Sequence, residues 1–334
     1  MTMSRLGSTG VDPSFDVHLD EGWRARSLAH EVTAGLTARP KRLSPRWLYD
    51  DRGRELFDRI TRLPEYYPTE AEREILLRHA DEIAQATDAD TLVELGSGTS
   101  DKTRALLDAF AATGQLRRFV PFDVSEQTLR DAAIALAERY PSLAVHGVVG
   151  DFHEHLEAVP RDGVPVLAFL GSTIGNFYPD ERSRFLADVA KWMTRSSSFL
   201  LGVDLVKPVD RIMAAYNDPS GVTAEFTLNL LRVLNRELDA DFDLDGFEHV
   251  GLWDPAHTRV DLRLRSLRSQ TVQVRGVDLT VTFGEDEELR AEISTKFTLD
   301  QVAAELAEAG MAVVRTWTDD DDEDVAVVLA RLAP

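Results

Sequence analysis

The amino-acid sequence predicts an α/β fold: a doubly wound, mostly parallel sheet that ends in an antiparallel hairpin, with an inserted α+β domain. Short apolar runs alternate with helical patterns between residues 91 and 206, as in parallel strands joined by helices. The alternation stops after Val206, and 207–296 holds helices followed by strand-like segments. The last two strands, 311–318 and 325–332, are joined by so short a turn that they must be antiparallel.

The N-terminal part of the chain is expected to be mainly helical. Residues 1–17 contain no apolar signal-peptide core, so we expect them to form a flexible leader. Two prolines make the segment LPEYYPT (63–69) irregular. Thr69 and Glu72 have the spacing of a capping box and should begin a helix. The patterns predict helices at 16–40, 54–63 and 69–87.

The remaining elements follow from the change between the two periods. We expect strands at 91–96, 117–125, 143–152, 164–177 and 197–206, and helices at 101–112, 126–139 and 179–193. Beyond them we expect helices at 208–216, 222–237 and 298–309, and strands at 249–254, 259–268, 271–283 and 291–297. We predict one domain from 69–206 and 297–334, and a second, substrate-binding domain from 18–68 and 207–296.

Composition excludes several classes of function. The formal net charge of −21 and the absence of a basic run argue against binding to nucleic acid. No apolar run reaches the ~18 residues of a membrane span. The chain has no cysteine, so disulfides, thiolate nucleophiles and zinc–thiolate sites are excluded, as suits a cytoplasmic protein. The acidic run 319–324 lacks the spacing of a calcium loop and is expected to be a solvated turn. We expect a cytoplasmic monomer.

The segment VELGSGTSDKT lies at the first strand-to-helix turn, where open α/β sheets bind ligands. Gly96 and Gly98 allow a tight turn and a close approach of the ligand. The third glycine of a dinucleotide fingerprint is replaced by Asp101, which would repel a pyrophosphate at a helix N-terminus. The turn therefore favours a cofactor without phosphates, and it speaks against a nicotinamide dehydrogenase.

Carboxylates follow the next two strands. Asp123 ends the second strand, where it can accept both hydroxyls of a ribose. Asp151 and Phe152 end the third strand, and a carboxylate beside an aromatic ring suits the amine and the face of an adenine. With Glu94 and the two glycines, this order indicates S-adenosylmethionine (SAM). A fold that has lost its cofactor, or one that binds another nucleoside, stays an alternative.

The strand AEISTKF (291–297) places Glu292, Ser294 and Lys296 on one face, and Ile293, Thr295 and Phe297 on the other. From the residues alone, Glu292 reads as a solvated strand residue. The alternative is that Glu292 and Ser294 face a ligand that needs a carboxylate and a hydroxyl side by side.

Longer motifs carry a specific resemblance. The segments LFDRITRLPEYYPT, VELGSGTSDKTR, PFDVS, GDFHEHL, FLGSTIGN, LGVDLVK and LNRELDADFDLDGFEHV resemble the L-histidine Nα-methyltransferases of ergothioneine biosynthesis, from about residue 28 to the end. The resemblance implies a Rossmann-like class I methyltransferase domain and a dedicated substrate domain. It implies SAM-dependent trimethylation of the α-amine of free histidine, giving hercynine (histidine betaine), without a metal.

The resemblance also implies roles for single residues. Tyr49 and Phe57 would lie near the amine, Tyr49 orienting it, and Glu292 and Ser294 would grip the imidazole. From the residues alone, a tyrosine between prolines such as Tyr66 is as readily explained by packing. The implied carboxylate ligands are Tyr66, Asn176 and Tyr216; the cofactor ligands are Gly96, Lys102, Asp123, Asp151 and Phe152; Gly171, Thr173 and Leu262 complete the substrate site.

Leu262 departs from the family pattern, because the best-known members carry a methionine beside the imidazole. Both side chains are apolar and similar in volume, so the change puts fine substrate preference in question rather than the reaction. Two rival functions stay open: methylation of another aromatic amino acid, such as tryptophan or tyrosine, and a non-catalytic SAM-binding regulator. Glu292 argues against indole, which has only one donor, and intact Tyr66, Asn176 and Tyr216 argue against the regulator.

Overall fold

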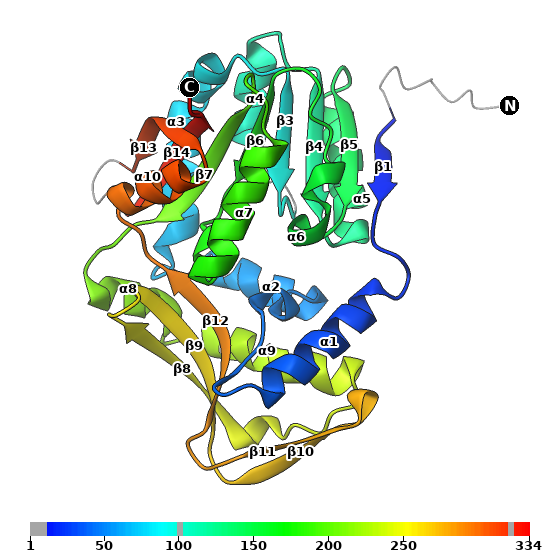
Figure 1. Cartoon of the computed structure of the whole chain (residues 1–334), viewed down its shortest axis with the longest axis vertical. Helices are drawn as coiled ribbons and strands as arrows, with labels where there is room; N and C mark the ends of the chain where they lie inside the picture. The colour runs from blue at the N-terminus through cyan, green and yellow to red at the C-terminus, as the bar shows by residue number, and fades with distance from the viewer. Residues whose placement is uncertain (1–11, 99–102, 320–323) are drawn as a thin grey trace, which may run out of the picture.

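The computed structural model describes residues 12–98, 103–319 and 324–334. Its larger sheet has the order β1-β5-β4-β3-β6-β7-β14-β13, in which β1 to β7 run parallel and β14 is antiparallel to both β7 and β13 (Figure 1). This is the class I methyltransferase arrangement, and the predicted fold class is confirmed. The strands are β1 (Ser14–Val17), β3 (Thr91–Leu95), β4 (Arg118–Asp123), β5 (Ala144–Val149), β6 (Pro165–Phe169), β7 (Ser198–Asp204), β13 (Met311–Thr318) and β14 (Val325–Leu332).

Helices cover both faces of this sheet, which explains why its central strands are apolar throughout. Every residue of β3, β6 and β7 is buried. One face packs against α3 (Tyr67–Thr87), α4 (Thr103–Ala112) and α5 (Glu126–Arg139). The other packs against α7 (Pro179–Trp192) and α10 (Leu299–Glu308), near the short helices α6 (Phe152–His155) and η2 (Leu156–Ala158).

A second sheet has the order β2-β12-β9-β8 and lies below the first in the view of Figure 1. Its strands are β2 (Lys41–Arg42), β8 (Phe247–Asp254), β9 (Arg259–Ser266) and β12 (Glu288–Thr295), and a separate hairpin joins β10 (Gln270–Val274) to β11 (Leu279–Phe283). This sheet, the hairpin and the helices near them form the second lobe of the molecule. The helices are α1 (Trp23–Thr37), α2 (Asp51–Ile60), α8 (Val209–Tyr216) and α9 (Val222–Glu237), with the 3-10 turns η1 (Pro45–Leu48), η4 (Leu244–Gly246) and η5 (Arg275–Val277).

One hydrophobic core joins two distant parts of the chain in this second lobe. Leu28, Trp47 and Leu56 pack in it with Phe226 and Leu289. This core thus contains residues from both 18–68 and 207–296. No helix in the described residues is long and apolar enough to cross a membrane.

The start of the chain corrects two predictions. Residues 14–17, expected to belong to a flexible leader, form β1, which pairs in parallel with β5. The helix expected at 16–40 begins only at Trp23. Strand β1 forms because its backbone groups pair with those of β5, far along the chain. A local sequence pattern cannot predict such a distant partner.

The expected capping box at Thr69 is also wrong. Helix α3 begins two residues earlier, with Tyr66 as N-cap and Pro68 in the first turn. A proline is tolerated there because an N–H group at that position would have no partner within the helix. Glu72 is instead buried, and its Oε1 accepts a hydrogen bond of 2.6 Å from the amide of Gly171. A long-range contact therefore replaces the local one.

Two predicted strands are interrupted. The expected strand 164–177 ends at Phe169, because Gly171 and Ser172 have φ values of 77° and 54°. A short turn, η3 (Thr173–Asn176), follows. The expected strand 271–283 splits into β10 and β11 around η5.

Candidate active site

Strand β12 and the residue that follows it bring three polar side chains to one buried face. Glu292, Ser294 and Lys296 are 8%, 4% and 0% exposed. The register of β12 against β9 shifts between Arg290 and Glu292, just before this stretch begins. The alternation predicted from the sequence holds, but the interpretation of Glu292 as a solvated residue is wrong, because other elements cover this face.

Tyr216, at the end of α8, reaches this face. Its hydroxyl lies 2.8 Å from Ser294 Oγ and accepts a hydrogen bond of 2.8 Å from Lys296 Nζ. Lys296 Nζ also donates to Ser294 Oγ at 2.7 Å and to Asp204 Oδ2 at 2.6 Å. Asp204 is the last residue of β7, so this network ties the second sheet to the end of the first.

An aromatic cluster adjoins the network. The Tyr49 ring contacts Phe57 and Phe226, with centroid distances of 5.4 and 5.3 Å. Tyr66 lies between Phe57 and Tyr216, at 6.1 and 6.2 Å. Four residues predicted from distant parts of the sequence therefore meet, and they are joined by Phe226, which no sequence motif indicated.

The local structure around Tyr49 fixes where its ring lies. Tyr49 follows η1, and the next residue, Asp50, caps the N-terminus of α2 by accepting a hydrogen bond of 2.8 Å from the Gly53 amide. Asn229 of α9 donates a bond of 2.7 Å to the same Asp50 oxygen. Both ends of the Tyr49 backbone are thereby held by defined elements.

Burial shapes the electrostatics of these groups. It raises the pKa of Glu292 to about 7, and the nearby Lys296 ammonium offsets part of that effect. Burial, followed by the charge of Glu292, holds the pKa of Tyr49 well above its usual value, and burial does the same for Tyr66 and Tyr216. All three phenols therefore keep their protons near neutral pH and can donate hydrogen bonds.

The Glu292 carboxylate can accept a further hydrogen bond. Its Oε2 is buried and has no hydrogen-bond partner among the described residues. A buried acceptor without a partner costs about 1–3 kcal/mol. A ligand that offers an N–H group at this point would remove the cost.

Leu262 is the cross-strand neighbour of Glu292 in the pairing of β9 with β12. It is 2% exposed and packs in a small cluster with Tyr216 and Ile212. The structure thus places Leu262, where the family resemblance implies a methionine, directly beside the carboxylate.

Asn176 lies in η3, the turn after β6. This turn lies tight against β12, since a Cβ added at Gly175 would come within 2.8 Å of the Thr295 carbonyl oxygen. Thr173 Oγ1 donates 3.0 Å to the Leu170 carbonyl, and the Gly171 amide is held by Glu72. Gly171 and Thr173 thus have structural partners of their own, while Asn176 is half-buried beside the network's strand.

The predicted cofactor turn follows β3. Gly96 and Gly98 have φ values of 67° and 49°, and a Cβ on either would meet nothing within 4 Å. Asp123 ends β4 and accepts hydrogen bonds from the amides of Gly98 (3.1 Å) and Ser125 (2.8 Å). Glu94 is buried and accepts from the hydroxyl of Thr103. Lys102 and Asp101 lie outside the described residues.

Asp151 and Phe152 complete this side. Asp151 Oδ1 caps α6 by accepting from the His153 amide at 2.9 Å, and Oδ2 pairs with Arg46 Nη1 at 2.7 Å. Phe152 packs against Phe169, with ring centroids 5.5 Å apart. An open glycine turn with carboxylates at the ends of the next two strands fits a nucleoside cofactor. Nothing in the sequence pointed to Arg46.

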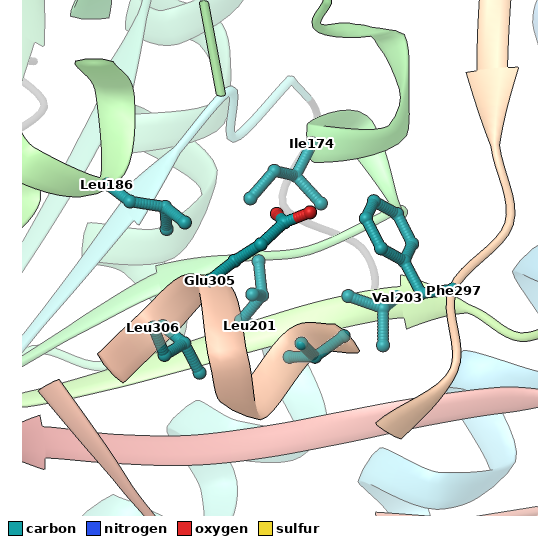
Figure 2. A pocket seen from close by; sticks show the side chains of 8 residues that line it. Ile174, Leu186, Leu201, Val203, Phe297, Glu305 and Leu306 are labelled. Carbon is teal, nitrogen blue, oxygen red and sulfur yellow. The ribbon is translucent and has the colours of Figure 1, made fainter. Parts of the chain in front are cut away.

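The site is distinct from the small cavity in Figure 2, which lies between η3, α7 and α10 and is lined by Ile174, Leu201 and Glu305 among others. At about 10 Å³ it has room for about one water molecule. Within the described residues, no three His, Asp or Glu side chains form a group that could hold a metal ion.

Comparisons with known proteins identify the family. Residues 28–332 match the family model for histidine-specific, SAM-dependent methyltransferases. The histidine N-alpha-methyltransferase of Mycobacterium tuberculosis is 52% identical over 303 residues, covering 91% of this chain and 94% of its own. That of Mycolicibacterium smegmatis is 52% identical over 295 residues, covering 88% and 92%.

More distant similarities exist. Ergothioneine biosynthesis protein 1 of Neurospora crassa is 30% identical over 288 residues, covering 84% of this chain and 32% of its own. A solved SAM-dependent methyltransferase from Clostridium acetobutylicum aligns with a TM-score of 0.48 at 10% identity, covering 84% of this chain and 99% of its own. The family model and the mycobacterial relatives span nearly the whole chain, and the chain belongs to the histidine-specific, SAM-dependent methyltransferase family.

Proposed function

We propose that this protein transfers three methyl groups from SAM to the α-amine of L-histidine, giving hercynine, the first step of ergothioneine biosynthesis. The observation that carries the proposal is the buried face of β12, where the unpartnered Glu292 Oε2 lies two residues from Ser294. An imidazole that carries a proton on each nitrogen offers two donors, one for each of these oxygens.

Selectivity follows from the same burial. A ring without two N–H groups would leave Glu292 buried and unpaired, which is how a polar site rejects analogues. Indole offers one donor, so tryptophan should be disfavoured. Leu262 beside Glu292 supplies an apolar wall of a size close to methionine.

The tyrosines and Asn176 would hold the rest of the amino acid. In this proposal Tyr66, Tyr216 and Asn176 donate to the substrate carboxylate, with Gly171 and Thr173 shaping the turn that carries Asn176. The two phenols can act as donors because burial keeps their pKa values high. Fixing the carboxylate leaves the amine to point away from it, toward the aromatic cluster.

Tyr49 and Phe57 would act on the amine. Only the neutral amine can attack. In the first two transfers the Tyr49 hydroxyl, which stays protonated, can accept a hydrogen bond from an amine N–H and so aim the lone pair; the dimethylated amine has no N–H left. The ring faces of Tyr49 and Phe57 would stabilise the ammonium that forms, by cation–π contact. Alignment and exclusion of water therefore carry most of the catalysis.

On the cofactor side, we propose that Glu94, Gly96, Gly98, Lys102, Asp123, Asp151 and Phe152 hold SAM. When bound, SAM supplies an electrophilic methyl group on a sulfonium sulfur. Asp123 at the end of β4 would accept from the ribose hydroxyls, and Asp151 with Phe152 would bind the adenine. The Gly96–Gly98 turn leaves open space for the ligand to approach the backbone.

The test is a competition. Purified protein is incubated with SAM and an equimolar mixture of the twenty amino acids, and products are followed by mass spectrometry. A single product three methyl groups heavier than histidine is expected. Methylation of another amino acid would overturn the substrate, and cofactor binding without any product would favour the non-catalytic regulator.

We further propose that the protein is a cytoplasmic monomer, needs no metal, binds neither nucleic acid nor membranes, and is divided into the two domains named above. Light scattering should give about the chain mass of 37.2 kDa. Activity should survive treatment with EDTA. A dimer would contradict the proposed monomer, and a loss of activity in EDTA would contradict the proposal that no metal is needed.

A further inference from the structure

The network at Tyr216 contains a buried cation to which the mechanism above gives no task. Lys296 is 0% exposed, and its Nζ contacts Asp204 Oδ2 at 2.6 Å, Ser294 Oγ at 2.7 Å and Tyr216 Oη at 2.8 Å. An ammonium has three N–H donors and no acceptor. All three donors are therefore used, and both hydroxyl oxygens must accept from Lys296.

This arrangement restricts the hydroxyl protons. Tyr216 Oη and Ser294 Oγ are 2.8 Å apart, so one of the two hydroxyl protons lies between them. Only one proton remains to point at a ligand. Either Ser294 donates to Tyr216 and Tyr216 donates to the ligand, or the reverse.

The two arrangements recognise different ligands. When Ser294 donates to Tyr216, Tyr216 can donate to a carboxylate, and Ser294 keeps one lone pair to accept from a ring N–H. In the reverse arrangement both lone pairs of Ser294 are filled, by Lys296 and by Tyr216, and Tyr216 has no proton left for a carboxylate.

We propose that Lys296 is a positioning residue that couples recognition of the substrate carboxylate at Tyr216 to recognition of the imidazole N–H at Ser294. By filling one lone pair of each hydroxyl, it leaves a single arrangement that satisfies both ends of histidine. The inference rests on the proposed function, because it takes the ligand to be histidine.

A neighbouring lysine provides a matched control. Lys207 also pairs with Asp204, and its side chain is only 3% exposed. Its remaining hydrogen bonds go to the carbonyl oxygens of Leu205 and Asp324, both at 2.8 Å, and not to the two hydroxyls. Lys207→Met therefore removes a buried cation from the same carboxylate without changing the hydrogen bonds of Tyr216 and Ser294.

The experiment is a double-mutant cycle on the dissociation constant of histidine, measured by calorimetry. Lys296→Met should weaken histidine binding by about tenfold or more, as for a lost hydrogen bond to a charged group. Lys207→Met should leave histidine affinity within about threefold. Both variants should bind SAM as the wild type does. If Lys296 acts through Ser294, its effect should largely vanish in the Ser294→Ala background.

Removing one partner of a buried ion pair can prevent folding. In Lys296→Met the Asp204 carboxylate keeps Lys207 as an ion-pair partner. The cycle is also repeated with Asp204→Asn present throughout, so that Lys296→Met takes no partner from a buried carboxylate. Additive effects of Lys296→Met and Ser294→Ala, or equal losses for Lys296→Met and Lys207→Met, would show that Lys296 is merely structural. Failure of the wild type to methylate histidine would instead refute the proposed function.

Discussion

Leu262 lies directly opposite Glu292 in the antiparallel pairing of β9 with β12, and both are buried. Cβ atoms of such a pair are about 4.5–5.5 Å apart. The aliphatic side chain therefore forms one wall beside the carboxylate and contributes to its desolvation. This relationship gives the first two predictions.

Leu262→Met should be mild, because leucine and methionine are both apolar and nearly equal in volume. We expect a loss of stability below about 1.5 kcal/mol and a KM for histidine within about threefold of the wild type. Leu262→Ala should cost about 2–5 kcal/mol because it leaves a cavity. Denaturant unfolding and steady-state kinetics test both; a methionine variant that turns over tryptophan would reverse the assignment of specificity to Glu292.

Glu292→Gln should change how stability depends on pH. The pKa of Glu292 is raised to about 7 from a usual 4.5, so the folded state binds this proton more tightly than the unfolded state does. The stability that this group contributes is present below about pH 4.5 and falls as pH rises to about 7, by at most about 3 kcal/mol. The free energy of unfolding of the glutamine variant minus that of the wild type should therefore be more positive at pH 8 than at pH 5, as measured by urea unfolding. A constant difference across this range would contradict the raised pKa.

Asn176→Ala tests the carboxylate clamp. Because η3 lies against β12, the loss of this amide should misplace the amino acid without disturbing the cofactor turn. We expect kcat/KM for histidine to fall about 10²-fold, with SAM affinity unchanged. Unchanged turnover would remove Asn176 from the site.

Gly96→Ala tests the cofactor turn. A Cβ at Gly96 meets no protein atom, so a loss of SAM affinity would come from the space that the ligand fills and from the strain at φ 67°. Gly114 is the matched control, since its φ is 71° and its Cβ would also meet nothing within 4 Å. Both alanine variants should lose about 1 kcal/mol of stability. Only Gly96→Ala should weaken SAM binding, by about tenfold, in calorimetry; equal SAM affinity in the two would place the cofactor elsewhere.

Sequence periodicity was enough to predict most elements of the fold. Helix α9 and strands β13 and β14 lie where the pattern placed them, since their signals are local and uninterrupted. The predictions fail where a contact with a residue far along the chain determines the local structure. Glu72 could have capped a helix, but it is used to hold the amide of Gly171, and Gly171 with Ser172 ends a strand that composition alone would continue.

The site shows the same division. The alternation of AEISTKF predicted that Lys296 and Ser294 share a face, but it gave Lys296 no role in a site. Its burial could not be predicted, because that depends on α8 and on Asp204 at the end of another sheet. The pairing of Arg46 with Asp151 joins residues from two lobes and has no local signature.

The shared core of the second lobe has a consequence for folding. Its first helices pack against strands that follow much later in the chain, so this lobe has a high contact order, and such topologies fold slowly. During synthesis, Tyr49 and Tyr66 leave the ribosome long before Glu292 exists. The parallel sheet can begin to form earlier, around its consecutive strand–helix units. The substrate side of the proposed site is therefore completed late in synthesis, and truncations that end before Glu292 should give a chain without the Glu292–Ser294 pair.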